Sequence, residues 1–305
     1  MFLNWLSALP GAAAQGIVWG IMAIGVYITY KILDIADLTV DGSICTGGAV
    51  CAVLVTNGVN VWLAMLIALL AGMLAGLVTG VLHTFMGIPA ILAGILTQLM
   101  LWSVNLKIMG KANIALPARS FDVLIAQLNV YKSLIVLAIS IVIIIGALYW
   151  FFGTELGTSL RATGNNLNMS RAQGINTDFN KILGLIISNG IVALSGALLA
   201  QYQGFADINM GRGAIVIGLA AVIIGEAVIS LFSVNFAAKL LGVIIGGIIY
   251  YFVYQTVIFL GLDADLLKML SAIVVAIFLA VPYWKNKYFT KAKPHHKPNG
   301  GQNNA

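Results

Sequence analysis

The sequence predicts an all-α protein, a polytopic bundle of roughly eight to ten transmembrane helices with a short helix on the cytoplasmic side. Hydrophobic residues make up 61% of the chain and charged residues only 9%, whereas roughly a quarter of a soluble domain is charged. The mean hydropathy is +1.01. The apolar runs are about 20 residues long, enough to cross a hydrocarbon core of about 30 Å as helices. Such spans must be helical because lipid satisfies no backbone hydrogen bonds.

The candidate spans follow one another within a single transmembrane domain, residues 1–284. The second is short, and the two near 213–258 are joined by only a few residues. They are 12–32, 44–57, 61–82, 88–108, 132–152, 180–202, 213–232, 235–258 and 266–284.

The residues after the last span, 285–305, form a basic tail that we expect to be disordered in the cytoplasm. It carries Lys285, Lys287, Lys291, Lys293 and Lys297 and no acidic residue, the pattern of a cytoplasmic terminus under the positive-inside rule. Counting back, segment 153–181 is cytoplasmic, while the amino terminus, 109–131 and 203–212 are outside. The net charge of +6 therefore indicates topology and contact with the bilayer, and no nucleic acid partner.

The chain has no motif for chemistry of its own. It lacks the phosphate loop G-x-x-x-x-G-K-S/T and the hydrolase motifs H-E-x-x-H and G-x-S-x-G, so we expect no catalytic residue, no metal site and no cofactor in this chain. Cys45 and Cys51 fit neither a zinc spacing nor a disulfide framework, and we interpret them as small buried hydrophobic residues.

Small residues at helical spacing predict close helix packing. Gly72, Gly76 and Gly80 are four residues apart, as are Gly242 and Gly246, and such steps let helix backbones approach closely. We favour packing inside the bundle over dimerisation for both sets.

Two glycine-interrupted segments, 36–50 and 205–220, predict a transport path, since irregular backbone at membrane depth lines water or is buried in protein. The first supplies five pathway candidates, and Asp207-Ile208-Asn209 repeats its plan in the second. Surface turns are the alternative for both. The pathway candidates are Asp37, Thr39, Asp41, Ser43 and Thr46.

Further polar residues lie within apolar runs. Glu226 is a sixth pathway candidate, because a carboxylate there is costly unless it faces a cavity, a partner or water at the helix end. Single amides either line a pore or bond across helices; these are Gln98, Asn105, Asn189 and Gln201.

The polar segment 153–181 has its own helix signals. Asn165 or Asn166 can cap a helix start, Gly174 can end it, and Thr177 can cap the next helix. The result is a short helix at 165–173, suited to a groove on a cytoplasmic partner. An unstructured connector is the alternative.

The same segment carries a resemblance. The runs GTSLRATGN (157–165) and RAQGIN (171–176) resemble the coupling-loop signature of permeases from ATP-binding cassette (ABC) importers of the branched-chain amino acid and ribose type. The likeness extends over 12–284. Three further runs look like a subgroup linked to tryptophan and tyrosine uptake: 37–43, 82–116 and 219–227. The acidic residue usual near the start of the coupling helix is replaced by Asn168 and its neighbours.

The resemblance implies a permease subunit in a bacterial plasma membrane, paired with a second copy, a cytoplasmic ATPase that holds ATP and Mg²⁺, and an extracytoplasmic substrate-binding protein. The solute would be small, an amino acid and among these an aromatic one favoured. An ion-coupled carrier acting alone and a membrane scaffold are the alternatives. The implied coupling residues are Arg161, Gly164, Asn165, Asn168, Arg171 and Gly174.

Overall fold

The computed structural model describes residues 2–121, 123–229 and 235–259, with a few isolated positions beyond: Met269, Ala272, Ile273, Ala276, Ile277 and Ala280. The predicted span 266–284 falls largely outside these residues, and the basic tail 285–305 falls wholly outside them.

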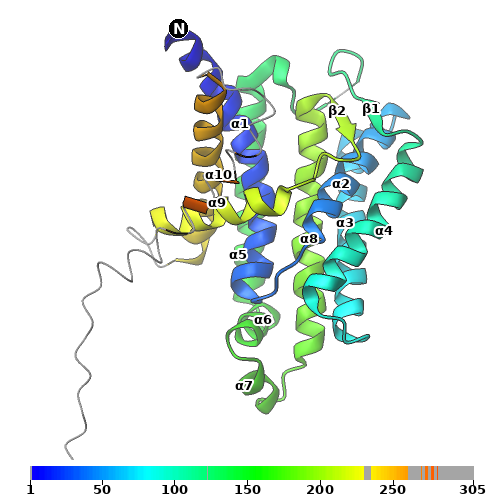
Figure 1. The fold of residues 1–305 in the computed structure, drawn as a ribbon, viewed down its shortest axis with the longest axis vertical. Coiled ribbons are helices and arrows are strands. Elements are labelled where there is room, and N and C mark those ends of the chain that lie inside the picture. Colours follow the sequence, from blue (N-terminus) through cyan, green and yellow to red (C-terminus); the bar gives the residue numbers. More distant parts are fainter. Residues whose placement is uncertain are drawn as a thin grey trace, which may run out of the picture.

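The described part of the chain is a helical bundle, as predicted (Figure 1). Among the residues that the structure describes, six helical segments are long and apolar enough to cross a membrane, and each corresponds to a predicted span. They are α1 (Phe2–Tyr27) continued by the π-helical turn η1 (Ile28–Ile32), α3 (Val61–Thr84), α4 (Ala90–Met109), α5 (Val130–Gly153), α8 (Thr177–Gln203) and α10 (Phe236–Phe259).

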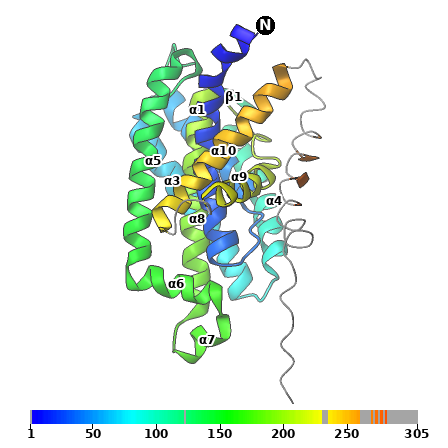
Figure 2. The same cartoon turned by 90° about the vertical axis from the view of Figure 1, so that its left-hand side faces the viewer.

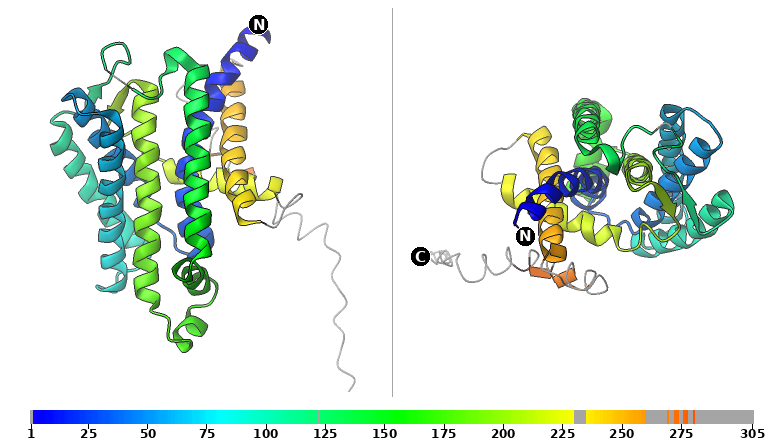
Figure 3. Two further views of the ribbon diagram at one scale, coloured as in Figure 1. Left: turned by 180° about the vertical axis from the view of Figure 1, so that it is seen from behind. Right: turned by 90° about the horizontal axis from the view of Figure 1, so that it is seen from above.

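Two further helices are shorter than a full span. Helix α2 (Val40–Thr56) has 17 residues and α9 (Ala214–Ile229) has 16, which gives each a length of about 25 Å. After η1 the chain turns back into the bundle as an extended segment before α2 begins (Figure 1). Helix α9 lies across the bundle (Figures 1 and 3). Treating 213–232 as an ordinary span was therefore wrong.

Helix α8 lies between two groups of helices, α2, α3 and α4 on one side and α1, α5, α9 and α10 on the other (Figure 3). Its contact with α3 leaves no room for a side chain at Gly72 or Gly76, because an added methyl group there would collide with the backbone of α8. Gly242 and Gly246 pack in the same way against α9. Both glycine sets thus pack inside one chain, as predicted.

The two ends of the bundle differ. One end carries α6 (Glu155–Asn165) and α7 (Leu167–Ala172), and the other carries the amino terminus and a small antiparallel sheet (Figure 2). In that sheet β1 (Asn113–Ala115) pairs with β2 (Phe205–Asp207), with Ile114 opposite Ala206. A single turn, η2 (Gln127–Asn129), precedes α5. The sequence placed these segments on the same opposite sides, although it did not predict the sheet.

Candidate functional site

Helix α7 is the short helix that the sequence predicted. Asn166, one of the two proposed caps, accepts a 2.9 Å hydrogen bond from the backbone N–H of Met169, while Asn165 is the last residue of α6. Gly174 follows the helix with a φ of +78°, a conformation that favours glycine. The unstructured alternative is therefore wrong.

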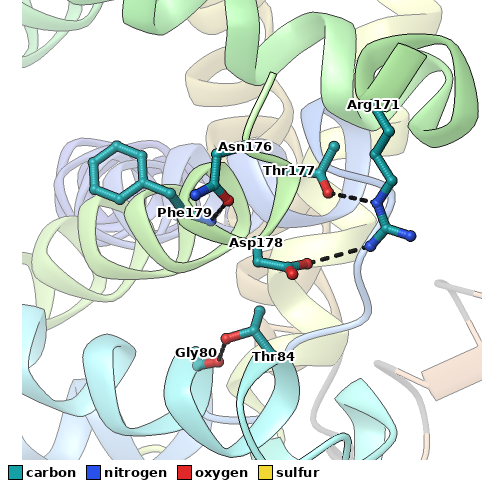
Figure 4. Close-up of polar contacts among 7 residues, drawn as sticks. All are labelled: Gly80, Thr84, Arg171, Asn176, Thr177, Asp178 and Phe179. Atoms are coloured by element: carbon teal, nitrogen blue, oxygen red, sulfur yellow. Dashed lines mark hydrogen bonds and ion pairs between the residues drawn. The ribbon is translucent and has the colours of Figure 1, made fainter. Parts of the chain in front are cut away.

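The cap of α8 is one residue earlier than predicted. Asn176 accepts a 3.0 Å hydrogen bond from the N–H of Phe179, and Thr177 is the first residue of the helix. The Thr177 hydroxyl instead accepts a 3.0 Å hydrogen bond from Nε of Arg171, whose guanidinium also lies 3.4 Å from Asp178 (Figure 4). The Arg171 side chain thus connects α7 to the start of α8 through Thr177 and Asp178.

Helix α6 was missed by the sequence reasoning. Thr154 caps it by accepting a 3.3 Å hydrogen bond from the N–H of Gly157, and the buried side chains of Leu160 and Thr163 share its inner face. Asn180 of α8 donates a 2.8 Å hydrogen bond to Thr163. The Thr154 cap and the three-residue spacing from Leu160 to Thr163 were the signals that could have found it.

The six predicted coupling residues fall into two sets. The first faces the bundle: the Arg161 guanidinium lies 4.3 Å from the ring centroid of Phe236 and 5.2 Å from that of Phe152, and Gly164 packs directly against the backbone of Ile32. The second set is exposed on α7 and around it: Asn168, Arg171 and Gly174, with Asn165 exposed at the end of α6.

The exposed set shares its end of the bundle with large apolar side chains. Met169 on α7 is 61% exposed and Phe179 on α8 is 50% exposed. In the turn between α3 and α4, which reaches the same end (Figure 1), Phe85 is 89% exposed. Large exposed apolar side chains gathered at one end of a bundle are consistent with a protein-binding surface.

An open cavity of about 1010 Å³ lies above α6. The inward coupling residue Arg161 lines it, and so does Glu226, which forms a 3.0 Å ion pair with Lys31. The Glu226 side chain is 37% exposed, so it faces a cavity at the α6 end and has a charged partner there. Lys239 and Asp34 add to the charged lining.

Four of the predicted pathway residues are buried and bonded within the protein. Asp37 accepts hydrogen bonds from the N–H of Thr39 at 2.9 Å and from the Asn189 amide at 2.7 Å. Ser43 donates a 2.6 Å bond to the same amide. The hydroxyl of Thr39 continues into a chain through Thr79 and Thr97, and Thr46 bonds back to Gly42. Asn189 therefore bonds across helices.

Asp41 has a different environment. Its carboxylate accepts hydrogen bonds from the N–H groups of Gly213 at 3.0 Å and Ile215 at 2.9 Å, so it caps the start of α9, where the helix dipole favours a negative charge. Asp41 also lines a cavity of about 120 Å³ together with two of the single amides, Gln98 and Asn105.

The two segments that looked alike in sequence share a turn. Asp37 accepts a hydrogen bond from the N–H two residues on, and Asp207 does the same with Asn209 at 2.7 Å. Each turn precedes one of the short helices, α2 or α9. Helices that begin inside a bundle are typical of substrate paths in transporters.

Comparisons with known proteins agree with this architecture. The family described as "Branched-chain amino acid transport system / permease component" matches residues 9–281. The tyrosine transport system permease protein of Clostridioides difficile (strain R20291) is 45% identical over 90% of this chain and 91% of its own. The autoinducer 2 import system permease protein LsrC of Yersinia pseudotuberculosis is 32% identical over 82% of this chain and 66% of its own.

A solved structure shares the fold. PsaBC from Streptococcus pneumoniae in complex with Fab superposes with a TM-score of 0.54, at 15% identity, over 95% of this chain and 99% of the other.

Proposed function

The chain belongs to the branched-chain amino acid transport system permease family, and on this premise we propose that two copies of it form the path by which an ABC importer takes up an α-amino acid. It is a multi-pass membrane protein and a permease of an ABC import system, a family in which ATPase activity lies in a separate subunit. Membership therefore implies an ATPase and a substrate-binding protein as partners.

An aromatic amino acid is the favoured solute. The support is the tyrosine transport permease of Clostridioides difficile, which is 45% identical over nearly the whole chain. This proposal concerns the substrate class; selection in such a system also depends on the binding protein.

The observation that carries the coupling role is the pair α6–α7. Helix α7 presents Asn168, Met169 and Arg171 to solvent, as a helix that enters a groove on an ATPase would. Helix α6 packs against the end of the bundle, where Arg161 contacts α5 and α10. A force applied to α7 would thus reach the helices around the large cavity. ATP and Mg²⁺ would be bound by the ATPase.

The side of the membrane follows from this role. If α7 binds an ATPase, the α6–α7 end is cytoplasmic, the β1–β2 sheet faces the substrate-binding protein, and the carboxyl terminus lies in the cytoplasm of a bacterial cell. The open cavity beside Glu226 would then be the inner mouth of the path.

The test is uptake of radiolabelled L-tyrosine by proteoliposomes that contain the permease, its ATPase and its binding protein. We expect uptake to require ATP on the side of the liposome membrane that carries the ATPase. Uptake should disappear with an ATPase whose hydrolytic carboxylate is substituted. Uptake by the permease alone, driven by an ion gradient, would support the ion-coupled carrier instead.

A further inference from the structure

The small cavity beside the start of α9 has an unusual lining. It lies between the first turns of α2, the middle of α4 and the segment that precedes α9, and its volume is about 120 Å³. Opposite charges and an indole ring meet there with the two amides of α4. The residues that carry the argument are Asp41, Gln98, Trp102, Asn105 and Arg212.

Asn105 has an unsatisfied side chain. It is only 1% exposed, and neither its amide nitrogen nor its amide oxygen has a hydrogen-bond partner in the part of the chain that the structure describes. By contrast, Asn189 bonds to Asp37 and Gln201 bonds to the N–H of Leu124. Because buried amides in native proteins are nearly always bonded, the Asn105 amide points to a group that enters the cavity.

The two charged side chains of the cavity form no ion pair with each other in the described part of the chain. The Asp41 carboxylate is bonded to backbone N–H groups of the α9 start, and neither ion pair of the described residues involves Asp41 or Arg212. Arg212 is exposed and comes just before α9, which lies across the bundle (Figure 1). An exposed guanidinium with no acidic partner among the described residues is available to an anion that enters the cavity.

We infer that this cavity binds the ammonium and carboxylate groups of an α-amino acid, the ammonium at Asp41 and the carboxylate at Arg212. A zwitterion places a positive group beside Asp41 and a negative group beside Arg212. The amide of Asn105 can accept from the ammonium and donate to the carboxylate. The inference rests on the proposed transport of an amino acid and adds the site where the permease itself holds it.

The size of the cavity fits this assignment. Ligand pockets for whole drug-sized molecules occupy about 300–1,000 Å³, so about 120 Å³ holds the polar head of an amino acid and leaves its side chain outside. Trp102 lies at the edge with 45% of its surface exposed, where an indole can stack on an aromatic side chain. The large cavity beside α6 is less suited, because Glu226 there already has Lys31 as its partner.

The experiment measures binding to the full-length permease in lipid nanodiscs, without ATPase or binding protein, by isothermal titration calorimetry. The probes are L-tyrosine, tyramine, which lacks the carboxylate, and 3-(4-hydroxyphenyl)propionate, which lacks the ammonium. We expect L-tyrosine to bind at least about tenfold more tightly than either analogue, since each lost charged contact is worth that much or more. Equal binding of all three, or no binding of L-tyrosine, would overturn the inference.

Variants then assign the groups. Arg212→Gln, at an exposed side chain, should bring L-tyrosine and tyramine to the same affinity, whereas the exposed Arg119→Gln in the outer loop should leave their ratio unchanged. Asn105→Leu should weaken L-tyrosine binding several-fold while it raises the thermal midpoint, because it removes an unsatisfied amide. Unchanged selectivity in Arg212→Gln contradicts the site.

The result is separable from the proposed function. ATP-dependent uptake by the wild-type assembly, together with absent binding to the isolated permease, would overturn this site and leave the importer role intact. Binding of L-tyrosine to the permease without ATP-dependent uptake would support this site and overturn the importer role.

Discussion

The guanidinium carbon of Arg161 lies 4.3 Å from the ring centroid of Phe236, so the segment between α5 and α8 touches the first residue of α10. The ring centroid of Phe152 lies 5.2 Å from the same carbon, and the two rings are 5.0 Å apart, so the guanidinium packs against a pair of neighbouring rings. One cation therefore joins α5, α6 and α10. This contact connects the surface expected to meet the ATPase with the wall of the large cavity.

Arg161→Gln should uncouple these helices without removing the α7 surface. A cation–π contact is worth about 0.5–2 kcal/mol, so we expect a modest fall in the thermal midpoint and a several-fold loss of uptake. The ATPase should still co-purify, which pull-down from detergent measures. Loss of the ATPase together with uptake would contradict a role in transmission.

Arg171→Glu should abolish co-purification of the ATPase while the permease stays inserted. The substitution reverses an exposed charge on α7 and places it beside Asp178. Asp178→Asn is the matched control: it removes the partner of Arg171, an exposed pair worth at most about 1 kcal/mol, and keeps the α7 surface. If both variants lose the ATPase equally, the internal pair matters and the docking surface does not.

Asn189→Leu should destabilise the protein by about 2–3 kcal/mol, because it leaves the buried carboxylate of Asp37 and the hydroxyl of Ser43 without their partner. The measurement is the thermal midpoint in detergent, together with the abundance of the protein in the membrane.

Asp41→Ala should have a different effect, since that carboxylate caps α9 and lines a cavity. We expect it to alter solute-stimulated ATP turnover more than abundance; an effect on abundance alone would make Asp41 structural.

Gly47→Ala should prevent correct packing, since the added methyl group would collide with the carbonyl oxygen of Ala193 on α8. Gly146→Ala on α5 is the control, where a methyl group would meet no atom within 4 Å. Alanine favours a helix over glycine by about 0.5–1 kcal/mol, so this control should hold or gain stability. Equal thermal midpoints for the two variants would contradict the close α2–α8 contact.

Local signals predicted the parts of the fold that local forces determine. Apolar run lengths predicted the spans, and the Asn166 cap with Gly174 predicted α7, because capping involves residues only a few positions apart. Helix α9 was misjudged because 213–232 is apolar apart from Glu226 and Ser230, and hydropathy does not distinguish a helix that faces lipid from one buried among other helices.

The candidate site was harder to predict because its contacts join distant residues. Asp37 and Asn189 are 152 positions apart, and no local pattern indicates that α2 packs on α8. The sequence singled out Asp41 and Asn105, but only the packing of α4 beside α2 shows that they line one cavity while Thr39 and Ser43 do not. Arg161 likewise faces inward only because the ring of Phe236, at the start of α10, lies 4.3 Å from its guanidinium carbon.

The β1–β2 pairing is made by main-chain groups, which every residue type except proline supplies. Ile114 and Ala206 are buried beneath it, whereas Asn113, Ala115 and Phe205 are exposed. Substitutions at Ala115 and Phe205 should therefore leave the main-chain ladder between the two helix ends in place, whereas Asn113 also donates a 3.4 Å side-chain hydrogen bond to Asp207 across it. If the sheet meets the substrate-binding protein as proposed, substitutions at these exposed positions would change that contact without altering the packed helices.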